Sequence, residues 1–245
     1  ILAVAGSRGM IGAAALCSEA ILRAGAGIAV LAVAAGLQGI LAAKLTEVMT
    51  QPLPESAAGI LGDKAREPLQ QMAAAYAAVL LGPGLGRASE TGELIRRFVK
   101  ELKKPCVLDA DALFAFVGHT GELASLSAPV ILTPHLGEMA VLSGITIPAL
   151  RDDLIPLCRK AAADWRAILV VKSECTIVAL PDGRVFLTST GNAGMATAGT
   201  GDVLAGTIAG LIKQTASLED AALLGVYLHG AAGDLAAEER AEGLL

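Results

Sequence analysis

Residues 191–206 read Gly-Asn-Ala-Gly-Met-Ala-Thr-Ala-Gly-Thr-Gly-Asp-Val-Leu-Ala-Gly, so that a loop of small residues runs directly into an apolar helix. The backbone N–H groups of such a loop can converge on an anion, and the dipole of the following helix favours negative charge at the same place. This stretch therefore predicts a phosphate-binding turn. The sequence contains no GxxxxGK[ST] motif, which excludes the P-loop class.

Asp202 is an unexpected residue in a phosphate-binding turn, because its charge would repel the ligand. A general base that is needed beside a transferring phosphoryl group would explain it. The alternative is an N-cap of the helix, a position at which Asp is among the preferred residues. The residues by themselves leave both interpretations open.

Apolar runs alternate with helical patterns along the rest of the chain. We predict strands at 2–5, 28–33, 78–81, 106–108, 130–132, 168–171, 176–180 and 185–188, and helices at 11–23, 90–102, 152–165, 203–213 and 218–237. The last two strands form a hairpin around Pro181-Asp182-Gly183. The alternation predicts an α/β fold, a three-layer α-β-α sandwich with a mostly parallel central sheet. We expect one domain over residues 1–245, in which residues 51–68 form a surface excursion.

The composition narrows the class of protein. Of the 245 residues, 54% are hydrophobic and 18% are charged, which excludes disorder, and the net charge of −5 argues against a nucleic-acid-binding surface. Residues 24–43 are uncharged and long enough to span a bilayer, but their glycines favour a turn, a buried strand and a helix start instead. We expect no membrane partner.

The cysteines and the two ends of the chain carry weaker signals. Cys17, Cys106, Cys158 and Cys175 show neither metal-ligand nor CxxC spacing, which favours reduced thiols in a cytoplasmic protein. The chain begins with Ile-Leu-Ala-Val-Ala, as if inside a strand, and ends without a clear stop. We expect further residues beyond both ends.

Residues that can bind ligands or take part in catalysis follow several of the predicted strands. In parallel sheets, ligands bind at these carboxyl ends of the strands. The run Gly82-Pro83-Gly84-Leu85-Gly86 is either a ligand loop or a tight turn. Asp109 and Asp111 either hold a metal or ligand, or form an Asx turn and a helix cap, which the residues slightly favour.

Two further strand ends carry candidate ligands. His135 and Glu138 can meet on one helical turn and hold a metal or a ligand hydroxyl, or else Thr133 and Glu138 cap that helix. Lys172 can reach a phosphate, or is an ordinary solvated lysine. For His229, inside a helix, a packing role is favoured.

Taken together, these segments resemble the ADP-dependent NAD(P)H-hydrate dehydratase family, a branch of the ribokinase-like superfamily. The resemblance covers nearly the whole chain, in order. Its segments are Gly6-Ser7 with Gly12-Ala13-Ala14, residues 23–27, 82–86, 108–113 and 132–138, residues 191–206, and residues 227–234.

The resemblance implies a repair reaction. NADH and NADPH become hydrated at the nicotinamide ring, and members of this family use ADP to phosphorylate the ring hydroxyl of the S epimer, after which phosphate leaves and AMP is the other product. It implies that Asp202 is the general base and that Mg²⁺ lies at Glu138. The implied substrate contacts are Ala13, Gly86, His135 and Asp202. The implied nucleotide contacts are Lys172, Ser173, Glu174, Cys175 and Thr176, with Ala198, Gly199, Thr200 and Gly201 around the phosphoryl group.

The chain departs from the family pattern at three places. Ser173 stands where the family usually has Gly, and Phe114 where it usually has Asn. The family's Lys-Gly segment before the first strand is absent, which we interpret as truncation. The resemblance also implies a homo-oligomer, with a tetramer among the options, and in many bacteria an epimerase domain fused upstream.

Three other functions compete with this one. A ribokinase-like kinase of a vitamin-precursor alcohol, of the hydroxymethylpyrimidine or thiazole type, would use the same Gly-Thr-Gly-Asp turn, although His135 stands where many such kinases have Asn. A non-enzymatic nucleotide-binding module would not need Asp202. A structural subunit would not need so many glycine loops at strand ends.

Overall fold

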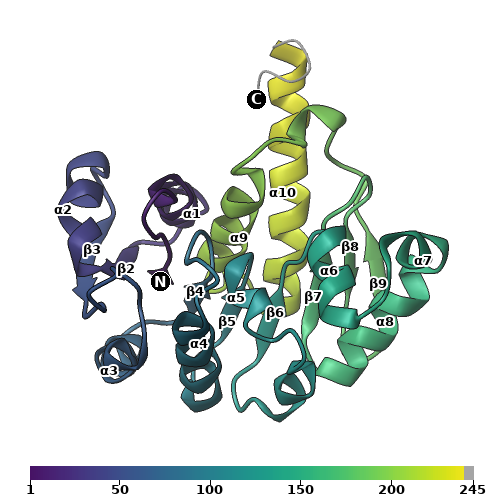
Figure 1. The fold of residues 1–245 in the computed structure, drawn as a ribbon. Coiled ribbons are helices and arrows are strands. Elements are labelled where there is room, and N and C mark those ends of the chain that lie inside the picture. Colours follow the sequence, from purple (N-terminus) through teal and green to yellow (C-terminus); the bar gives the residue numbers. More distant parts are fainter. Residues whose placement is uncertain (240–245) are drawn as a thin grey trace.

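A nine-stranded sheet forms the centre of the computed structural model, which describes residues 1–239 (Figure 1). The strand order is β3-β2-β1-β4-β5-β6-β7-β8-β9, parallel as far as β7 and antiparallel for the two strands after it. The strands are β1 (Leu2–Val4), β2 (Val30–Ala34), β3 (Met49–Leu53), β4 (Val79–Leu81), β5 (Cys106–Leu108), β6 (Val130–Leu132), β7 (Ile168–Val171), β8 (Ile177–Ala179) and β9 (Val185–Leu187). The predicted mostly parallel α/β fold is confirmed.

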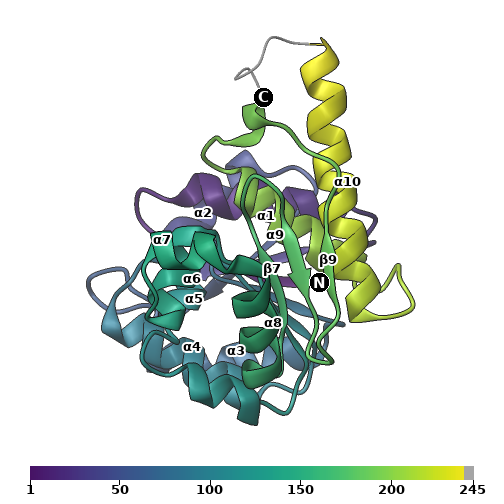
Figure 2. The same ribbon diagram turned by 90° about the vertical axis from the view of Figure 1, so that its right-hand side faces the viewer.

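Helices cover both faces of this sheet, which gives three layers (Figure 2). One face carries α1 (Ile11–Arg23), α2 (Ala35–Lys44), α9 (Thr200–Leu211) and α10 (Leu218–Glu239). The other carries α3 (Arg66–Ala74), α4 (Ser89–Glu101), α5 (Asp111–Phe114), α6 (Leu136–Ser143) and α8 (Leu154–Trp165), with α7 (Ile147–Asp152) beside α6 and α8. Short 3₁₀ turns lie at Asp63–Ala65, Thr120–Ser125 and Ala193–Met195.

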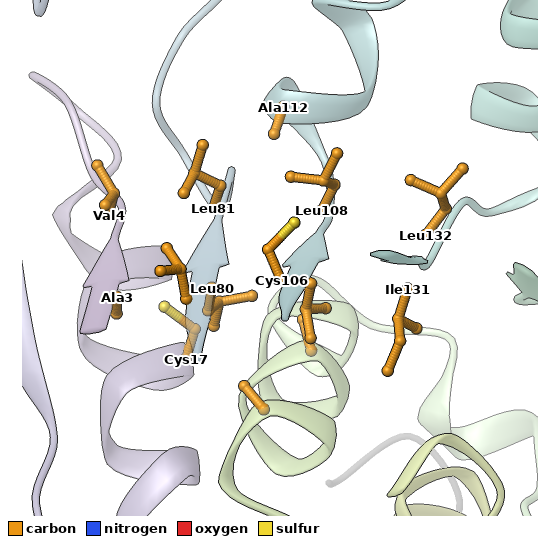
Figure 3. Packing of buried hydrophobic residues seen from close by; sticks show 14 of the residues in the cluster. Ala3, Val4, Cys17, Leu80, Leu81, Cys106, Leu108, Ala112, Ile131 and Leu132 are labelled. Atoms are coloured by element: carbon orange, nitrogen blue, oxygen red, sulfur yellow. The ribbon is translucent and has the colours of Figure 1, made fainter. Parts of the chain in front are cut away.

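The central strands are apolar at every position because both of their faces are covered. Side chains of neighbouring strands line up in register and alternate between the two helical layers (Figure 3). Leu81 and Leu108 face the layer that contains Ala112, and Leu80 faces the layer that contains Cys17. All five residues are at most 1% exposed. This burial explains why unbroken apolar runs, without polar alternation, marked these strands in the sequence.

The predicted surface excursion at residues 51–68 is wrong at both of its ends. Residues 51–53 belong to the edge strand β3, and α3 begins at Arg66. Of the residues in β3 only Leu53 is buried, so the strand has no apolar run to reveal it. Pro52 is compatible with this position because an edge strand does not need every backbone N–H.

Several predicted boundaries shift by a few residues. The strand after α1 is Val30–Ala34 instead of 28–33. The helix predicted at 152–165 is α8, which begins at Leu154, because α7 ends at Asp152 and Asp153 separates the two helices. The helix predicted from Val203 begins at Thr200, which changes the position of Asp202 within it. Within residues 1–239, no helix combines the length and the apolar character needed to cross a bilayer.

Candidate active site

The strand order reverses between β1 and β4, and the loops after these two strands meet there. Gly6 N–H donates to the carbonyl oxygen of Pro83 at 2.8 Å. Gly82 has φ +127°, and a Cβ on it would lie 1.7 Å from the carbonyl oxygen of Asp109, so only glycine fits. A Cβ on Gly84 would lie 3.0 Å from Cβ of Ala13. The predicted substrate residues Ala13 and Gly86 therefore share one region at the switch point, the usual ligand crevice of such sheets.

Asp109 and Asp111 tie neighbouring loops together, and the interpretation of this pair as a turn and cap is wrong. Asp109 is 1% exposed, and its Oδ1 accepts from the Lys172 Nζ at 2.8 Å and from the Thr133 hydroxyl at 2.7 Å. Asp111 Oδ2 accepts from the backbone N–H of Gly86 at 2.8 Å. The N-cap of α5 is Ala110, whose side chain has no polar atom to cap with. The two carboxylates accept hydrogen bonds from loops that follow neighbouring strands, and not from their own turn.

Lys172 is mostly buried, which contradicts the interpretation as a solvated lysine. Its side chain is 19% exposed, and its Nζ lies 3.1 Å from the place that a Cβ on Gly201 would take. Burial lowers the pKa of Lys172, but the carboxylates of Asp109, Glu138 and Asp202 outweigh burial and hold it above its usual value. The Lys172 ammonium group therefore stays charged and lies at the N-terminal turn of α9, where a phosphate would bind.

Asp202 is the third residue of α9 and not its cap. The N-cap is Gly199, with φ +91°, and Leu16 of α1 lies 2.6 Å from where its Cβ would be. Burial, and after it the charge of Asp109, raises the pKa of Asp202 to about 6, while Lys172 opposes the shift. A carboxylate with a pKa near the working pH suits a general base. The N-cap interpretation of Asp202 is therefore wrong, and the general-base role stays a prediction.

His135 and Glu138 form a reciprocal capping box at the start of α6. His135 Nδ1 accepts from the N–H groups of Gly137 and Glu138, at 2.9 and 3.2 Å, and the His135 N–H donates to Glu138 Oε2 at 2.9 Å. The cap is thus His135 and not Thr133, which the alternative interpretation of this segment names, and Glu138 takes part in it. Because Nδ1 accepts, the proton of the neutral ring lies on Nε2, on an exposed side chain that can donate to a ligand.

Glu138 is buried beside this histidine. Burial raises the pKa of the Glu138 carboxyl, and the nearby Lys172 opposes that shift. In the part of the chain that the structure describes, no three His, Cys, Asp or Glu side chains gather as a metal site. Among the described residues, Glu138 therefore has no further protein carboxylate, histidine or cysteine with which to complete a metal site. Its carboxylate is close enough to Lys172 for each to shift the pKa of the other.

The loop between β7 and β8 holds the remaining predicted nucleotide residues, whose side chains are largely engaged in the fold. Ser173 Oγ donates to the carbonyl oxygen of Cys175, and Cys175 Sγ to that of Thr188 at 3.1 Å. Glu174 pairs with Arg151 of α7 at 2.8 Å. Nucleotide binding by Ser173, Glu174, Cys175 and Thr176 stays a prediction.

Asp234 of α10, which has no role predicted from the sequence, anchors the glycine loop. Its two carboxylate oxygens accept from the Gly191 N–H at 2.9 Å and from the Asn192 side-chain amide at 3.0 Å. A Cβ on Gly230 would lie 2.3 Å from Thr190 Oγ1, so the helix approaches the loop closely. The small residues Gly230 and Gly233 on this long helix were the sequence signal that could have predicted its close approach to the loop. His229 is half-buried on the same helix, and burial lowers its pKa. Its packing role stays a prediction.

Known proteins resemble this chain over its whole length. The family model for NAD(P)H-hydrate dehydratase matches residues 1–245. The bifunctional NAD(P)H-hydrate repair enzyme Nnr of Moorella thermoacetica is 47% identical over 242 residues, which are 99% of this chain and 46% of that protein. The ADP-dependent (S)-NAD(P)H-hydrate dehydratase of Xanthomonas campestris is 36% identical over 235 residues, which are 95% of this chain and 78% of that protein. The chain thus spans about half the length of the bifunctional relatives.

Solved structures agree with these relatives. The ADP/ATP-dependent NAD(P)H-hydrate dehydratase from Bacillus subtilis, co-crystallised with ATP/Mg²⁺, has a TM-score of 0.84 and 30% identity, over 100% of this chain and 83% of that one. A hydroxyethylthiazole kinase from Pyrococcus horikoshii, at 20% identity and a TM-score of 0.59 over 91% of this chain and 86% of that one, shares the fold alone. With a family match over its full length and Asp202 beside Lys172 at the first turn of α9, the chain belongs to the NAD(P)H-hydrate dehydratase family.

Proposed function

We propose that the chain catalyses the ADP-dependent dehydration of the S epimer of hydrated NADH or NADPH, and releases NAD(P)H, AMP and phosphate. The observation that carries the proposal is the Asp202 carboxylate, with a pKa of about 6, in the first turn of α9 beside Lys172. A non-enzymatic nucleotide-binding module would have no use for a carboxylate that repels its ligand. The family and the named relatives support the same reaction.

Asp202 takes the proton of the ring hydroxyl in this mechanism. The hydroxyl oxygen then forms a bond to the terminal phosphorus of ADP, and the bond from that phosphorus to the leaving AMP oxygen breaks. Phosphate is a far better leaving group than hydroxide. When the carbon–oxygen bond breaks, phosphate leaves with its electron pair, and loss of a proton from the neighbouring ring carbon restores the double bond.

The phosphoryl group is held by the start of α9 and by Lys172. The first N–H groups of a helix have no partner within it. In α9 those of Gly201 and Asp202 can face a phosphate, whereas the Thr200 N–H donates to the carbonyl oxygen of Thr197 at 3.4 Å. Donors that point at the place where negative charge develops stabilise the transition state. Lys172 adds a fixed positive charge, held in place by Asp109 at 2.8 Å.

The residues fit a Mg²⁺ ion that is shared with the nucleotide, and do not fit one held by protein alone. Mg²⁺ usually takes one or two carboxylates together with phosphates and waters, and within residues 1–239 no cluster of three candidate ligands occurs. We propose Glu138 as its protein ligand. When bound, the ion would neutralise charge on the phosphates.

Three wider properties follow as proposals from the relatives. Because the chain spans about half the length of the bifunctional repair enzymes, we propose that it works beside an NAD(P)H-hydrate epimerase. We also propose a homo-oligomer that acts in the cytoplasm, where reduced nicotinamide nucleotides are used.

The direct test is recovery of nicotinamide absorbance from hydrated NADH in the presence of ADP and Mg²⁺. Recovery that requires the nucleotide supports the dehydratase. If absorbance does not recover although ADP or ATP binds, the vitamin-kinase alternative takes its place, and alcohol substrates become the next assay.

Replacement of Lys172 should weaken nucleotide binding. We expect Lys172→Met to raise the Kd for ADP by at least about tenfold, since a hydrogen bond to a charged group contributes about 1.5–3 kcal/mol. Isothermal calorimetry measures this. Lys160→Met, at an exposed lysine of α8, is the matched control and should leave the Kd unchanged. Equal ADP affinity in the Lys172 variant and the wild type would reject the role.

A further inference from the structure

A cavity lies beside the loops that follow β1, β2 and β4, at the same end of the sheet as Lys172 but several strands away from it. Its volume is about 210 Å³. It is lined by Gly6, Ser7, Arg8, Ala34, residues 58–61 and residues 85–88. Arg8 and Arg87 are the only charged residues in that lining, whereas the chain as a whole has a net charge of −5. Asp111, just behind this lining, pairs with Arg87, so two cations and one carboxylate leave a net positive charge at a concave site, which favours an anion.

The Arg87 side chain is held through Nε and the face of its guanidinium group, and in the described part of the chain its two terminal nitrogens are left free. Its guanidinium carbon lies 3.5 Å from the centroid of the Phe114 ring, and its Nε donates to Asp111 Oδ1 at 2.9 Å. Within the described residues, its two terminal nitrogens make no hydrogen bond to the protein. Stacking and the single anchor orient the planar fork, which matches two oxygens of a phosphate. Phe114, which departs from the family pattern, thus supports an arginine at the cavity.

Arg8 lies in the loop after β1, and its side chain packs against Gly59 in the cavity wall. A Cβ on Gly59 would lie 2.8 Å from Arg8 Nε, so glycine makes room for the side chain. Within residues 1–239, no carboxylate pairs with Arg8. Its charge is therefore not neutralised by the protein.

The glycine N–H groups of this cavity are already used, so they cannot bind the anion. Gly6 donates to Pro83 and Gly59 to the carbonyl oxygen of Ser56 at 2.9 Å, while Gly86 donates to Asp111. The positive charge that favours an anion here therefore comes from the side chains of Arg8 and Arg87.

The size and place of the cavity identify which part of the substrate it takes. Ligand pockets for whole drug-sized molecules measure roughly 300–1,000 Å³, so a cavity of about 210 Å³ holds only part of a dinucleotide. It adjoins β4, three strands from β7 and Lys172, or roughly 14 Å at the usual strand spacing. Gly86, an expected substrate contact, lies in its wall. The phosphates of a dinucleotide lie away from its nicotinamide ring, so one can occupy the cavity while the ring lies nearer Asp202.

We propose that Arg8 and Arg87 bind a phosphate group of the hydrated dinucleotide in this cavity. The inference rests on the proposed dehydratase function. Two phosphates of the substrate share this chemistry: the pyrophosphate, which hydrated NADH and hydrated NADPH both carry, and the 2′-phosphate, which only the NADPH form carries.

The test compares both substrates in Arg8→Ala and Arg87→Gln. We expect KM for the hydrated dinucleotide to rise at least about tenfold, with kcat and the KM for ADP within twofold of wild type. A rise for both substrates identifies the pyrophosphate, and a rise for the NADPH form alone identifies the 2′-phosphate. Arg23→Ala removes an equal charge at an exposed pair with Glu47 and should change neither KM. If KM for both substrates stays within twofold of wild type in both variants, the inference is overturned.

A binding measurement separates this inference from the reaction itself. Titration of NADPH and NADH, followed by nicotinamide fluorescence, requires no turnover. If wild type does not restore hydrated NADH but binds NADPH, and Arg8→Ala or Arg87→Gln weakens that binding at least about tenfold, the phosphate site stands and the proposed reaction falls. If neither variant weakens the binding of NADPH or NADH, the phosphate site is rejected whatever the turnover.

Discussion

Asp202→Asn should lower kcat by at least about a hundredfold, the usual scale for loss of an acid/base group, while ADP still binds. The amide keeps the size of the side chain and removes its ability to accept the hydroxyl proton. ADP affinity should persist because Lys172 and the start of α9 remain in place. Absorbance recovery from hydrated NADH measures kcat, and calorimetry measures ADP binding. Normal turnover by the variant would show that Asp202 is not the base.

The pH dependence of the wild type tests the same role independently. With a pKa of about 6 for Asp202, kcat/KM should rise with pH through about 6 and then level off, because the base acts only when it has lost its proton. The residual rate of Asp202→Asn should not show this rise. A wild-type profile that is flat between pH 5 and about 7 would contradict the assignment.

Asp202→Asn should also stabilise the ligand-free protein at neutral pH. The pKa of Asp202 is raised in the fold from its usual 3.8 to about 6, so between these values the folded state binds more protons than the unfolded state. The contribution of this group to stability is therefore greatest below pH 4 and is lost as pH rises through about 6. Thermal unfolding should give a higher Tm for the variant at pH 7 and about equal values near pH 4. A lower Tm at pH 7 would mean that the charge is stabilising.

Gly206→Ala should have the largest effect on stability. A Cβ on Gly206 would lie 2.2 Å from the carbonyl oxygen of Cys17 and 2.8 Å from Cβ of Ala20, so α1 and α9 would have to move apart. We expect a loss of at least about 2 kcal/mol, within the range for overpacked cores, and a fall in Tm of about 4–8 °C. Chemical and thermal denaturation measure it.

Gly39→Ala provides the matched control with the opposite sign. Gly39 lies inside α2 with nothing within 4 Å of where its Cβ would be. The same added methyl group should therefore stabilise the protein by about 0.5–1 kcal/mol through helix propensity. If both variants shift stability in the same direction, the close contact between α1 and α9 is not what requires glycine at 206.

The sequence alone determined the buried part of the sheet. The runs at 106–108, 130–132 and 168–171 were predicted with the bounds that the structure shows, because strands covered on both faces must be apolar throughout. Strand β3 could not be found in this way, since its side chains are mostly exposed and carry no apolar run. The glycine-rich loop that leads into a helix was also readable, because its signal lies within sixteen consecutive residues.

The relations between the site residues came only from the tertiary structure. The sequence placed Asp109 and Lys172 after strands but favoured a local cap for the first and left the second open. Their ion pair at 2.8 Å joins positions that are 63 residues apart, and it exists because β5, β6 and β7 are neighbours in parallel register. Asp202 likewise could be a cap or a base until the helix start was known, and that start depends on Gly199 packing under Leu16 of α1. The pKa of an ionisable group is set by its burial and by the charges and hydrogen bonds around it, and most of these neighbours are distant along the chain.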